Sequence, residues 1–317
     1  MKLLTQVRTE IRLRHYSRRT EKQYLWWIRR FIDFHQRRHP AELGQAEVAA
    51  FLAHLAVERR VSAATQNQAL SALLFLYGEV LHQGVAWMAD LVRAKAPRRL
   101  PAVLTPDEAR AILTKLNGTA SLVCRLLYGS GLRLMEALQL RVQHLEFARG
   151  EIRVRGGKGD RDRVTMLPVV LQKPLRQHLE HVHSLHRQDL AAGAGWVELP
   201  AALGRKYPNA GREWAWQWVF PGKGIVTDGE SGERRRYHLH QTTIQRAFRE
   251  AARLSGVPKA AHCHTLRHSF ATELLRSNYD IRTVQELLGH KDVRVTMTYL
   301  HVLNRGGLGV RSPIDTL

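Results

Sequence analysis

Cysteine is nearly absent from this sequence, and its scarcity excludes two kinds of cross-linked domain. The 317 residues contain only Cys124 and Cys263, which lie far apart in the chain. Two such residues cannot build a disulfide framework, and they lack the close thiolate pairing that holds a structural zinc ion. We expect both cysteines to be reduced and partly buried.

Long hydrophobic runs are missing as well. No apolar stretch approaches the roughly 18 residues that a membrane span needs, and no signal-peptide segment follows Met1. The composition, 44% hydrophobic and 24% charged, is typical of a globular chain of about two domains. We therefore expect a cytoplasmic, nucleoid-associated protein that makes no membrane contact.

Acidic side chains are scarce relative to basic ones. The chain has 49 Lys plus Arg against 28 Asp plus Glu, a net charge of +21. Residues 1–100 hold 17 basic and 8 acidic side chains, which leaves 32 and 20 for the remainder, so both halves are basic. This distribution favours two lobes that bind one nucleic acid with strong salt dependence. A ribosome-associated protein or a merely solvated basic surface would also fit the charge alone.

The first part of the chain is predicted to be helical. Residues 17–38 carry an apolar stripe at helical spacing, and residues 45–58 and 62–82 show two further helical patterns. The stripe consists of Tyr24, Trp27, Ile28, Phe31 and Phe34. We expect a helical domain over residues 1–95, followed by a linker at 96–104, where two prolines interrupt any helix.

A second domain is predicted over residues 105–317. It begins with the capping box TPDE, and the glycine turn of YGSGLRLMEALQL then places Arg133 at a helix start. The alternating pattern of EIRVRGGKGDRDRVTMLP predicts a β-hairpin with Lys158 in its turn. Taken alone, a basic residue at either position is typical of a solvated surface.

The middle of this domain is unusually long and rich in tryptophan, with an insertion at about 187–213. Trp214, Trp216 and Trp218 alternate, which predicts a strand with all three rings on one side. Such a face could be buried in a sheet, or it could serve as a platform for unstacked bases. The sequence leaves both interpretations open.

The stretch from His264 to Tyr299 combines helical spacing with reactive side chains. His264 and Arg267 lie one turn apart near a predicted helix start, so they can converge on one anion. A second helix is closed by Gly289 immediately before His290. Neighbouring histidines invite a zinc interpretation, but paired cysteine spacing is lacking, and we predict no metal and no cofactor.

In sequence order, these motifs resemble the active site of the tyrosine recombinase (phage integrase) family. The matching positions are Arg133 in GLR, Lys158 in GGKGDRDR, His264 and Arg267 in HTLRH, His290 in LGH, and Tyr299. The resemblance implies a mainly α fold: an N-terminal helical core-binding domain, a SAM-like bundle, and an α+β catalytic domain with a small β-hairpin. The two domains would form a C-shaped clamp on DNA.

The resemblance assigns a role to each residue, and the chemistry explains why these residue types are needed. Arg133 and Arg267 would bind the scissile phosphate, with a hydrogen bond from His290.

Tyr299 would attack phosphorus while His264 accepts its proton and Lys158 protonates the departing 5′-oxygen. The 3′-phosphotyrosyl link would conserve the bond energy for rejoining.

The insertion LPAALGRKYPNAGREWAWQWVFP and the tail HVLNRGGLGVRSPIDTL look like those of integron integrases. This resemblance implies cassette insertion and excision at duplex attachment sites and at folded single-stranded sites, by a tetramer on DNA. It also suggests that Trp216, Tyr237 and His238 contact extruded bases.

Two alternative functions fit parts of the sequence. The stretch DIRTVQELLGHKDVRVTMTY could belong to a non-catalytic helix-turn-helix DNA-binding protein. A type IB topoisomerase uses a similar set of residues but relaxes supercoils, and the insertion counts against it.

Overall fold

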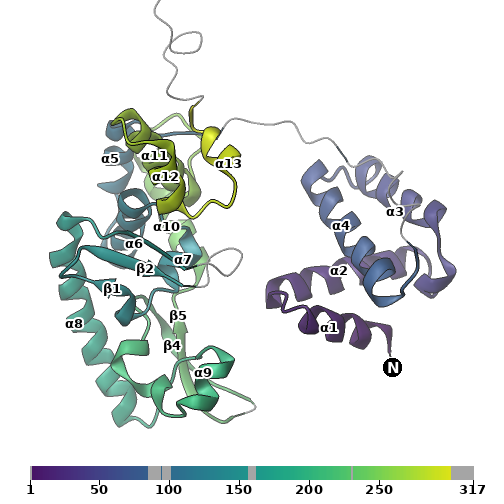
Figure 1. Ribbon diagram of the computed structural model, residues 1–317, viewed down its shortest axis with the longest axis horizontal. Coiled ribbons are helices and arrows are strands. Elements are labelled where there is room, and N and C mark those ends of the chain that lie inside the picture. The colour runs from purple at the N-terminus through teal and green to yellow at the C-terminus, as the bar shows by residue number, and fades with distance from the viewer. Residues whose placement is uncertain (1, 85–93, 95–100, 156–161, 230, 301–317) are drawn as a thin grey trace, which may run out of the picture. The chain divides into compact units, whose positions relative to one another are not determined.

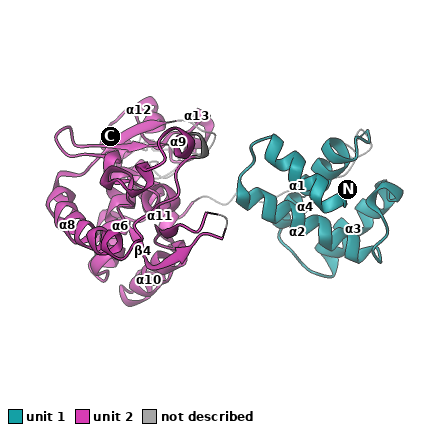
Figure 2. Ribbon diagram, turned by 90° about the horizontal axis from the view of Figure 1, so that it is seen from below, with its two compact units in different colours: residues 1–99 teal, residues 100–317 magenta. Residues whose placement is uncertain are grey.

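The computed structural model describes residues 2–84, 94, 101–155, 162–229 and 231–300. The chain divides into two compact units, Met1–Arg99 and Leu100–Leu317 (Figure 2). This division falls within the segment predicted as a linker. Over the described ranges, no helix combines the length and the apolar character that a membrane crossing requires.

The first unit is a helical bundle, as predicted (Figure 1). Its α-helices are α1 (Leu3–Leu13), α2 (Arg18–Phe34), α3 (Gln45–Val57) and α4 (Ala63–Phe75), and a π-helical turn extends α4 over Leu76–Val80. The predicted stripe on α2 provides much of the core, with Trp27, Ile28 and Phe31 buried. The bundle therefore forms because one face of each amphipathic helix is removed from water.

The second unit combines helices with two small antiparallel sheets (Figure 1). Its main core draws buried side chains from α5, α6, α7, α8, α10 and α11 and from strand β2 (Glu151–Val154), and a smaller apolar cluster joins α11 to α12. The helices are α5 (Pro106–Leu113), α6 (Gly118–Ser130), α7 (Leu134–Leu138), α8 (Val169–Ala191), α9 (Ala201–Lys206), α10 (Gln241–Leu254), α11 (Cys263–Arg276), α12 (Ile281–Leu288) and α13 (Val293–Met297).

The predicted hairpin is present as two paired strands. Strands β2 (Glu151–Val154) and β3 (Arg163–Met166) are antiparallel, with Ile152 opposite Thr165, and β1 (Leu145–Glu146) pairs with β2. Residues 156–161, which include Lys158, lie outside the described residues. The second sheet pairs β4 (Pro221–Thr227) with β5 (Arg234–His238). The composition of β5 gave no strand signal, because three of its five residues are arginines.

The predicted tryptophan strand is wrong. Trp214–Trp216 forms a turn of 3₁₀ helix, and Trp218 is buried, with its indole Nε1 donating to the Arg236 carbonyl at 3.1 Å. The buried Gln217 amide explains why residues 214–218 are not extended. It donates to three loop carbonyls, those of Gly195 at 3.2 Å, Gly211 at 3.1 Å and Glu213 at 3.3 Å. These hydrogen bonds favour a folded loop over an extended strand.

Two buried arginines attach the insertion and the tryptophan segment to the rest of the second unit. Arg236 on β5 makes a bidentate ion pair with Asp189 on α8, at 2.6 and 2.7 Å. Arg141 donates to the carbonyls of Trp216 and Glu198, both at 2.6 Å, and its guanidinium lies 3.9 Å from the Trp218 ring centroid. A planar group with five donors can satisfy several buried acceptors at once, so the insertion is fixed rather than loosely attached.

A glycine at the end of α6 should be required for the fold. Gly131 has φ 63°, and an added Cβ would lie 2.4 Å from Phe270. The left-handed conformation costs about 1–2 kcal/mol for alanine, and the clash adds about 1–3 kcal/mol. We therefore expect Gly131→Ala to lower the unfolding free energy by about 3 kcal/mol in urea titrations. Gly256→Ala is the matched control, because Gly256 also has a positive φ but faces open space, so an equal loss would contradict the steric argument.

Candidate active site

Helix α11 places two of the predicted residues one turn apart. His262 caps the helix, accepting the amide of Thr265 at 3.3 Å, and His264 is exposed in its first turn. The Arg267 side chain is only 1% exposed and donates to the carbonyls of Gly131 and Leu288, both at 2.5 Å. These carbonyls follow α6 and end α12, so the arginine is fixed at a junction of three helices.

Glu136 on α7 gathers three guanidinium groups around one carboxylate. Its oxygens lie 2.6 Å from Arg133, 2.6 and 3.0 Å from Arg163, and 3.7 Å from Arg267. Burial alone would raise the pKa of Glu136, but hydrogen bonds and charge from Arg163 and Arg133 lower it to about 2. One negative charge against three positive charges leaves a local positive excess, which favours the approach of an anion.

Tyr299 lies beside this cluster and is almost completely buried. Its ring belongs to the small apolar cluster between α11 and α12 and stacks on His290, with centroids 6.2 Å apart and planes at 21°. His290 Nε2 lies 3.2 Å from Arg267, and Nδ1 lies 2.9 Å from the Thr296 hydroxyl. Arginine can only donate, so Nε2 accepts and Nδ1 carries the proton. Helix α13 packs against α12 (Figure 1), and Tyr299 follows it closely in the chain.

His268, which no sequence motif indicated as catalytic, contacts Tyr299. Its Nδ1 lies 3.0 Å from the Tyr299 hydroxyl oxygen. Burial, with the nearby His264, lowers the pKa of His268 to about 4, and burial raises the pKa of Tyr299. The available signal was spacing, since His268 follows His264 by four residues and so shares its face of α11. Because a spacing of four residues is common in ordinary helices, it does not by itself indicate a catalytic residue.

The structure thus brings together five of the six predicted catalytic residues, and Lys158 lies outside the described residues. The remaining predicted residues lie elsewhere in the same unit. Trp216 is half-buried in the 3₁₀ turn, and Tyr237 on β5 is 37% exposed. His238 is half-buried, and its Nδ1 lies 2.9 Å from the Leu239 carbonyl.

A cavity adjoins the cluster of charged residues. It has a volume of about 530 Å³ and is lined by Arg133 and His264 together with Gln241, Gln245 and Arg249 of α10. These side chains offer cationic and amide donors to an anionic ligand. The cavity is therefore where a phosphate could approach the guanidinium groups.

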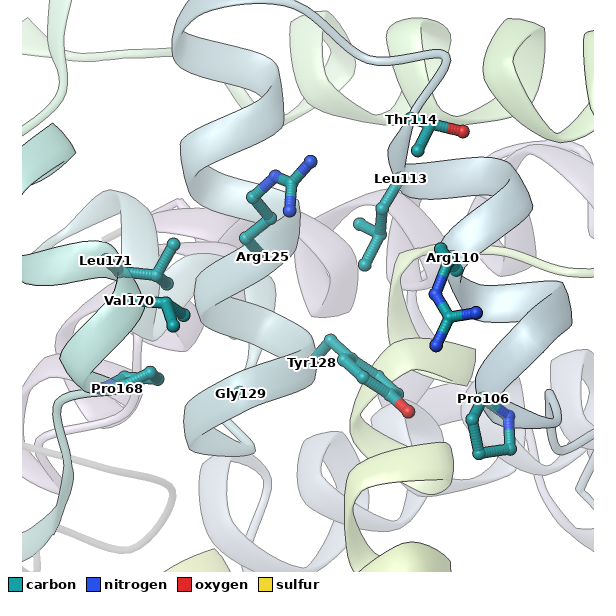
Figure 3. A pocket seen from close by; sticks show the side chains of 10 residues that line it. All are labelled: Pro106, Arg110, Leu113, Thr114, Arg125, Tyr128, Gly129, Pro168, Val170 and Leu171. Atoms are coloured by element: carbon teal, nitrogen blue, oxygen red, sulfur yellow. The ribbon is translucent and has the colours of Figure 1, made fainter.

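A second pocket has no catalytic candidate in its lining. It measures about 280 Å³ and lies between α5, α6 and the start of α8, with Leu113, Tyr128 and Leu171 among its walls (Figure 3). None of the described catalytic candidates lines it. Arg110 and Arg125 also line it, but most of its wall is apolar, so it suits a phosphodiester less well than the cavity beside Arg133.

Comparison with known families identifies this arrangement. The profile of the phage integrase family matches residues 102–305, and that of its N-terminal SAM-like domain matches residues 3–87. The chain belongs to the phage integrase family. This family comprises the tyrosine recombinases, so the predicted enzyme class, a site-specific DNA recombinase, is confirmed at that level.

Relatives of this integrase-family chain cover most of its length. A protein of Escherichia coli named integrase/recombinase is 54% identical over 100% of this chain and 94% of its own. The tyrosine recombinase XerC of Xanthomonas axonopodis is 33% identical over 83% of this chain and 76% of its own. A lambda integrase dimer bound to a core site has a TM-score of 0.63 at 19% identity, covering 94% of this chain and 93% of that one, which shows the shared fold.

Proposed function

We propose that this recombinase cuts and rejoins DNA through a 3′-phosphotyrosyl link to Tyr299. The observation that carries the proposal is the position of the Tyr299 hydroxyl, which shares one cluster with a buried arginine and two imidazoles. A phenol held beside fixed cations and a proton acceptor has the parts that phosphoryl transfer to tyrosine requires.

The cationic side chains would bind and stabilise the phosphate. Arg133 and Arg267 would each hold non-bridging oxygens, and their fixed donors would stabilise the additional charge of the transition state. His290, which is in contact with Arg267, would add a hydrogen bond. Glu136 would orient the guanidinium groups and limit their mutual repulsion.

Cleavage also needs a proton for the departing 5′-oxygen. We assign this step to Lys158, whose predicted position in the hairpin turn would carry an ammonium group to the DNA. The exposed His264 would contact the phosphate from the cavity beside Arg133. The covalent link conserves the energy of the broken bond, so a second 5′-hydroxyl can reseal the strand with neither ATP nor metal. Exchange of two duplexes requires two such cuts in each, and we propose a tetramer on DNA.

A nicked suicide substrate tests this function. Cleavage releases a short fragment that carries the free 5′-hydroxyl and diffuses away, so the wild-type protein should accumulate a covalent adduct, and peptide mapping should locate the DNA on Tyr299. Absence of an adduct would support a non-catalytic binder. Plasmid relaxation without strand exchange would instead favour a topoisomerase.

We further propose that the recombinase acts on integron cassette sites, including folded single-stranded sites with extruded bases. The half-buried Trp216 and the exposed Tyr237 offer ring faces for stacking, and His238 offers edge contacts. Arg141 supports this platform because it binds the Trp216 carbonyl and not only its ring.

Trp216→Ala should impair recombination selectively at folded single-stranded sites. Loss of one stacked base costs about 1–3 kcal/mol, so we expect a reduction of roughly 10- to 100-fold in exchange between a folded cassette site and a duplex site. Exchange between two duplex sites should persist, because the Arg141 contact to the backbone remains. Trp216→Phe retains a ring and serves as the matched control. Equal losses on both kinds of site would make Trp216 structural.

A further inference from the structure

The hydroxyl of Tyr299 contacts an imidazole to which no role has been given. The distance from Tyr299 Oη to His268 Nδ1 is 3.0 Å, and the ring centroids are 5.5 Å apart. Among the described residues, no other hydrogen bond reaches this hydroxyl. With the His268 proton on Nε2, the phenol donates to Nδ1. His268 is therefore the first group that a proton leaving Tyr299 meets.

His264, predicted from the sequence as the proton acceptor, is placed differently. It is exposed one turn earlier on α11, and its ring packs edge-on against His268, with centroids 4.5 Å apart and planes at 81°. In the part of the chain that the structure describes, no hydrogen bond joins His264 to Tyr299. An edge-on ring contact gives a proton no donor–acceptor path. His264 lines the cavity beside Arg133, where it is suited to contact the bound phosphate.

We propose that His268 Nδ1 accepts the phenolic proton as Tyr299 attacks phosphorus. In this step the Oη–H bond breaks and the Oη–P bond forms, while the P–O5′ bond breaks and the released oxygen takes a proton from Lys158. On rejoining, an incoming 5′-hydroxyl displaces Tyr299, and His268 returns the proton to the phenolic oxygen. The inference rests on the proposed function and deepens it by separating the base from the phosphate-binding histidine.

The surroundings of His268 are consistent with this role. The groups that face it are His262, His264 and Arg267 on its own helix, Tyr299 after α13 and His290 after α12. Burial, reinforced by charge repulsion from the histidines and the arginine on α11, keeps its pKa low, so the imidazole is neutral at pH 7 and its Nδ1 lone pair is available. A phosphate bound at Arg267 adds negative charge and favours the imidazolium. Because burial also raises the pKa of Tyr299, proton transfer should accompany attack rather than precede it.

His268→Asn separates proton transfer from positioning. The asparagine carbonyl can accept the Tyr299 hydrogen bond but cannot take up the proton. In single-turnover cleavage of the suicide substrate, we expect His268→Asn to be slower by roughly 10²–10⁴-fold. Binding of the intact site and the thermal unfolding midpoint should stay near wild type. Cleavage at the wild-type rate would overturn the inference.

Two chemical substitutions then identify the step that is lost. Fluorinated tyrosine at position 299 is more acidic and should partly restore His268→Asn, but it should not restore Lys158→Ala. A substrate with sulfur in place of the 5′-bridging oxygen has a better leaving group and should restore only Lys158→Ala. Restoration of His268→Asn by sulfur, or a selective gain for His264→Asn with fluorotyrosine, would overturn the inference. If the wild-type protein forms no adduct, the proposed function itself fails, so the two failures are distinguishable.

Discussion

Tyr299→Phe should abolish covalent adduct formation, with a loss on the order of 10⁴-fold or more, because the variant has no nucleophile. The ring would still pack against His290 and the apolar cluster of α11 and α12. Only the hydrogen bond to His268 is lost, at about 1 kcal/mol of stability. Single-turnover cleavage measures the chemical loss, and gel-shift binding and thermal unfolding measure what remains.

The matched control is Tyr279→Phe, which removes the hydroxyl of a tyrosine that is 54% exposed between α11 and α12. This variant should cleave at the wild-type rate. A covalent adduct that persists in Tyr299→Phe but disappears in Tyr279→Phe would move the nucleophile to Tyr279.

Glu136→Gln should destabilise the protein and impair cleavage together. The amide leaves three guanidinium groups without their shared negative charge, and breaking a buried ion pair typically costs about 3–5 kcal/mol. Arg133 and Arg267 would also lose a fixed orientation, so we expect cleavage to slow by roughly 10²–10³-fold. Urea unfolding and the suicide substrate provide the two measurements.

The control for this variant is Glu250→Gln on α10. Glu250 pairs with Arg253 at 2.6 Å, but both side chains are more than half exposed. Exposed ion pairs contribute little, so neither stability nor cleavage should change. A similar loss in both variants would show that removal of any carboxylate from this basic chain is harmful, and that Glu136 has no special role.

The low pKa of Glu136 makes stability depend on pH in a defined window. Its pKa falls from 4.5 to about 2 on folding, so the charged form contributes fully above pH 4.5 and is lost as the pH falls toward 2. At about 1.4 kcal/mol per unit, this contribution is about 3 kcal/mol. The wild-type protein should lose at least that amount of unfolding free energy in urea titrations between about pH 5 and pH 2, because other carboxyl groups titrate in the same range. The difference between wild type and Glu136→Gln should shrink over the same range, and a constant difference would contradict the linkage.

The local structure followed from short-range patterns in the chain. Apolar spacing predicted the buried stripe of α2, the capping box predicted the start of α5, and spacing put His264 and Arg267 on one helix. These features depend on residues within a few positions of one another, where backbone geometry fixes which side chains are neighbours. The strand prediction for the tryptophan segment was wrong because hydrogen-bond partners outside the segment decide its conformation. The Gln217 amide donates to the carbonyls of Gly195 and Gly211.

The sequence by itself determined the set of catalytic motifs, the division into two domains and the expectation of a nucleic-acid ligand. These features depend only on residue type, order and charge. Only the tertiary structure decided that Glu136 joins Arg133, Arg163 and Arg267, and that His268 rather than His264 meets the Tyr299 hydroxyl. The ion pair between Glu136 and Arg267 joins residues that lie 131 positions apart in the chain. A pattern in the chain gives no distance between two such side chains, because that distance is set by how helices pack on a shared core.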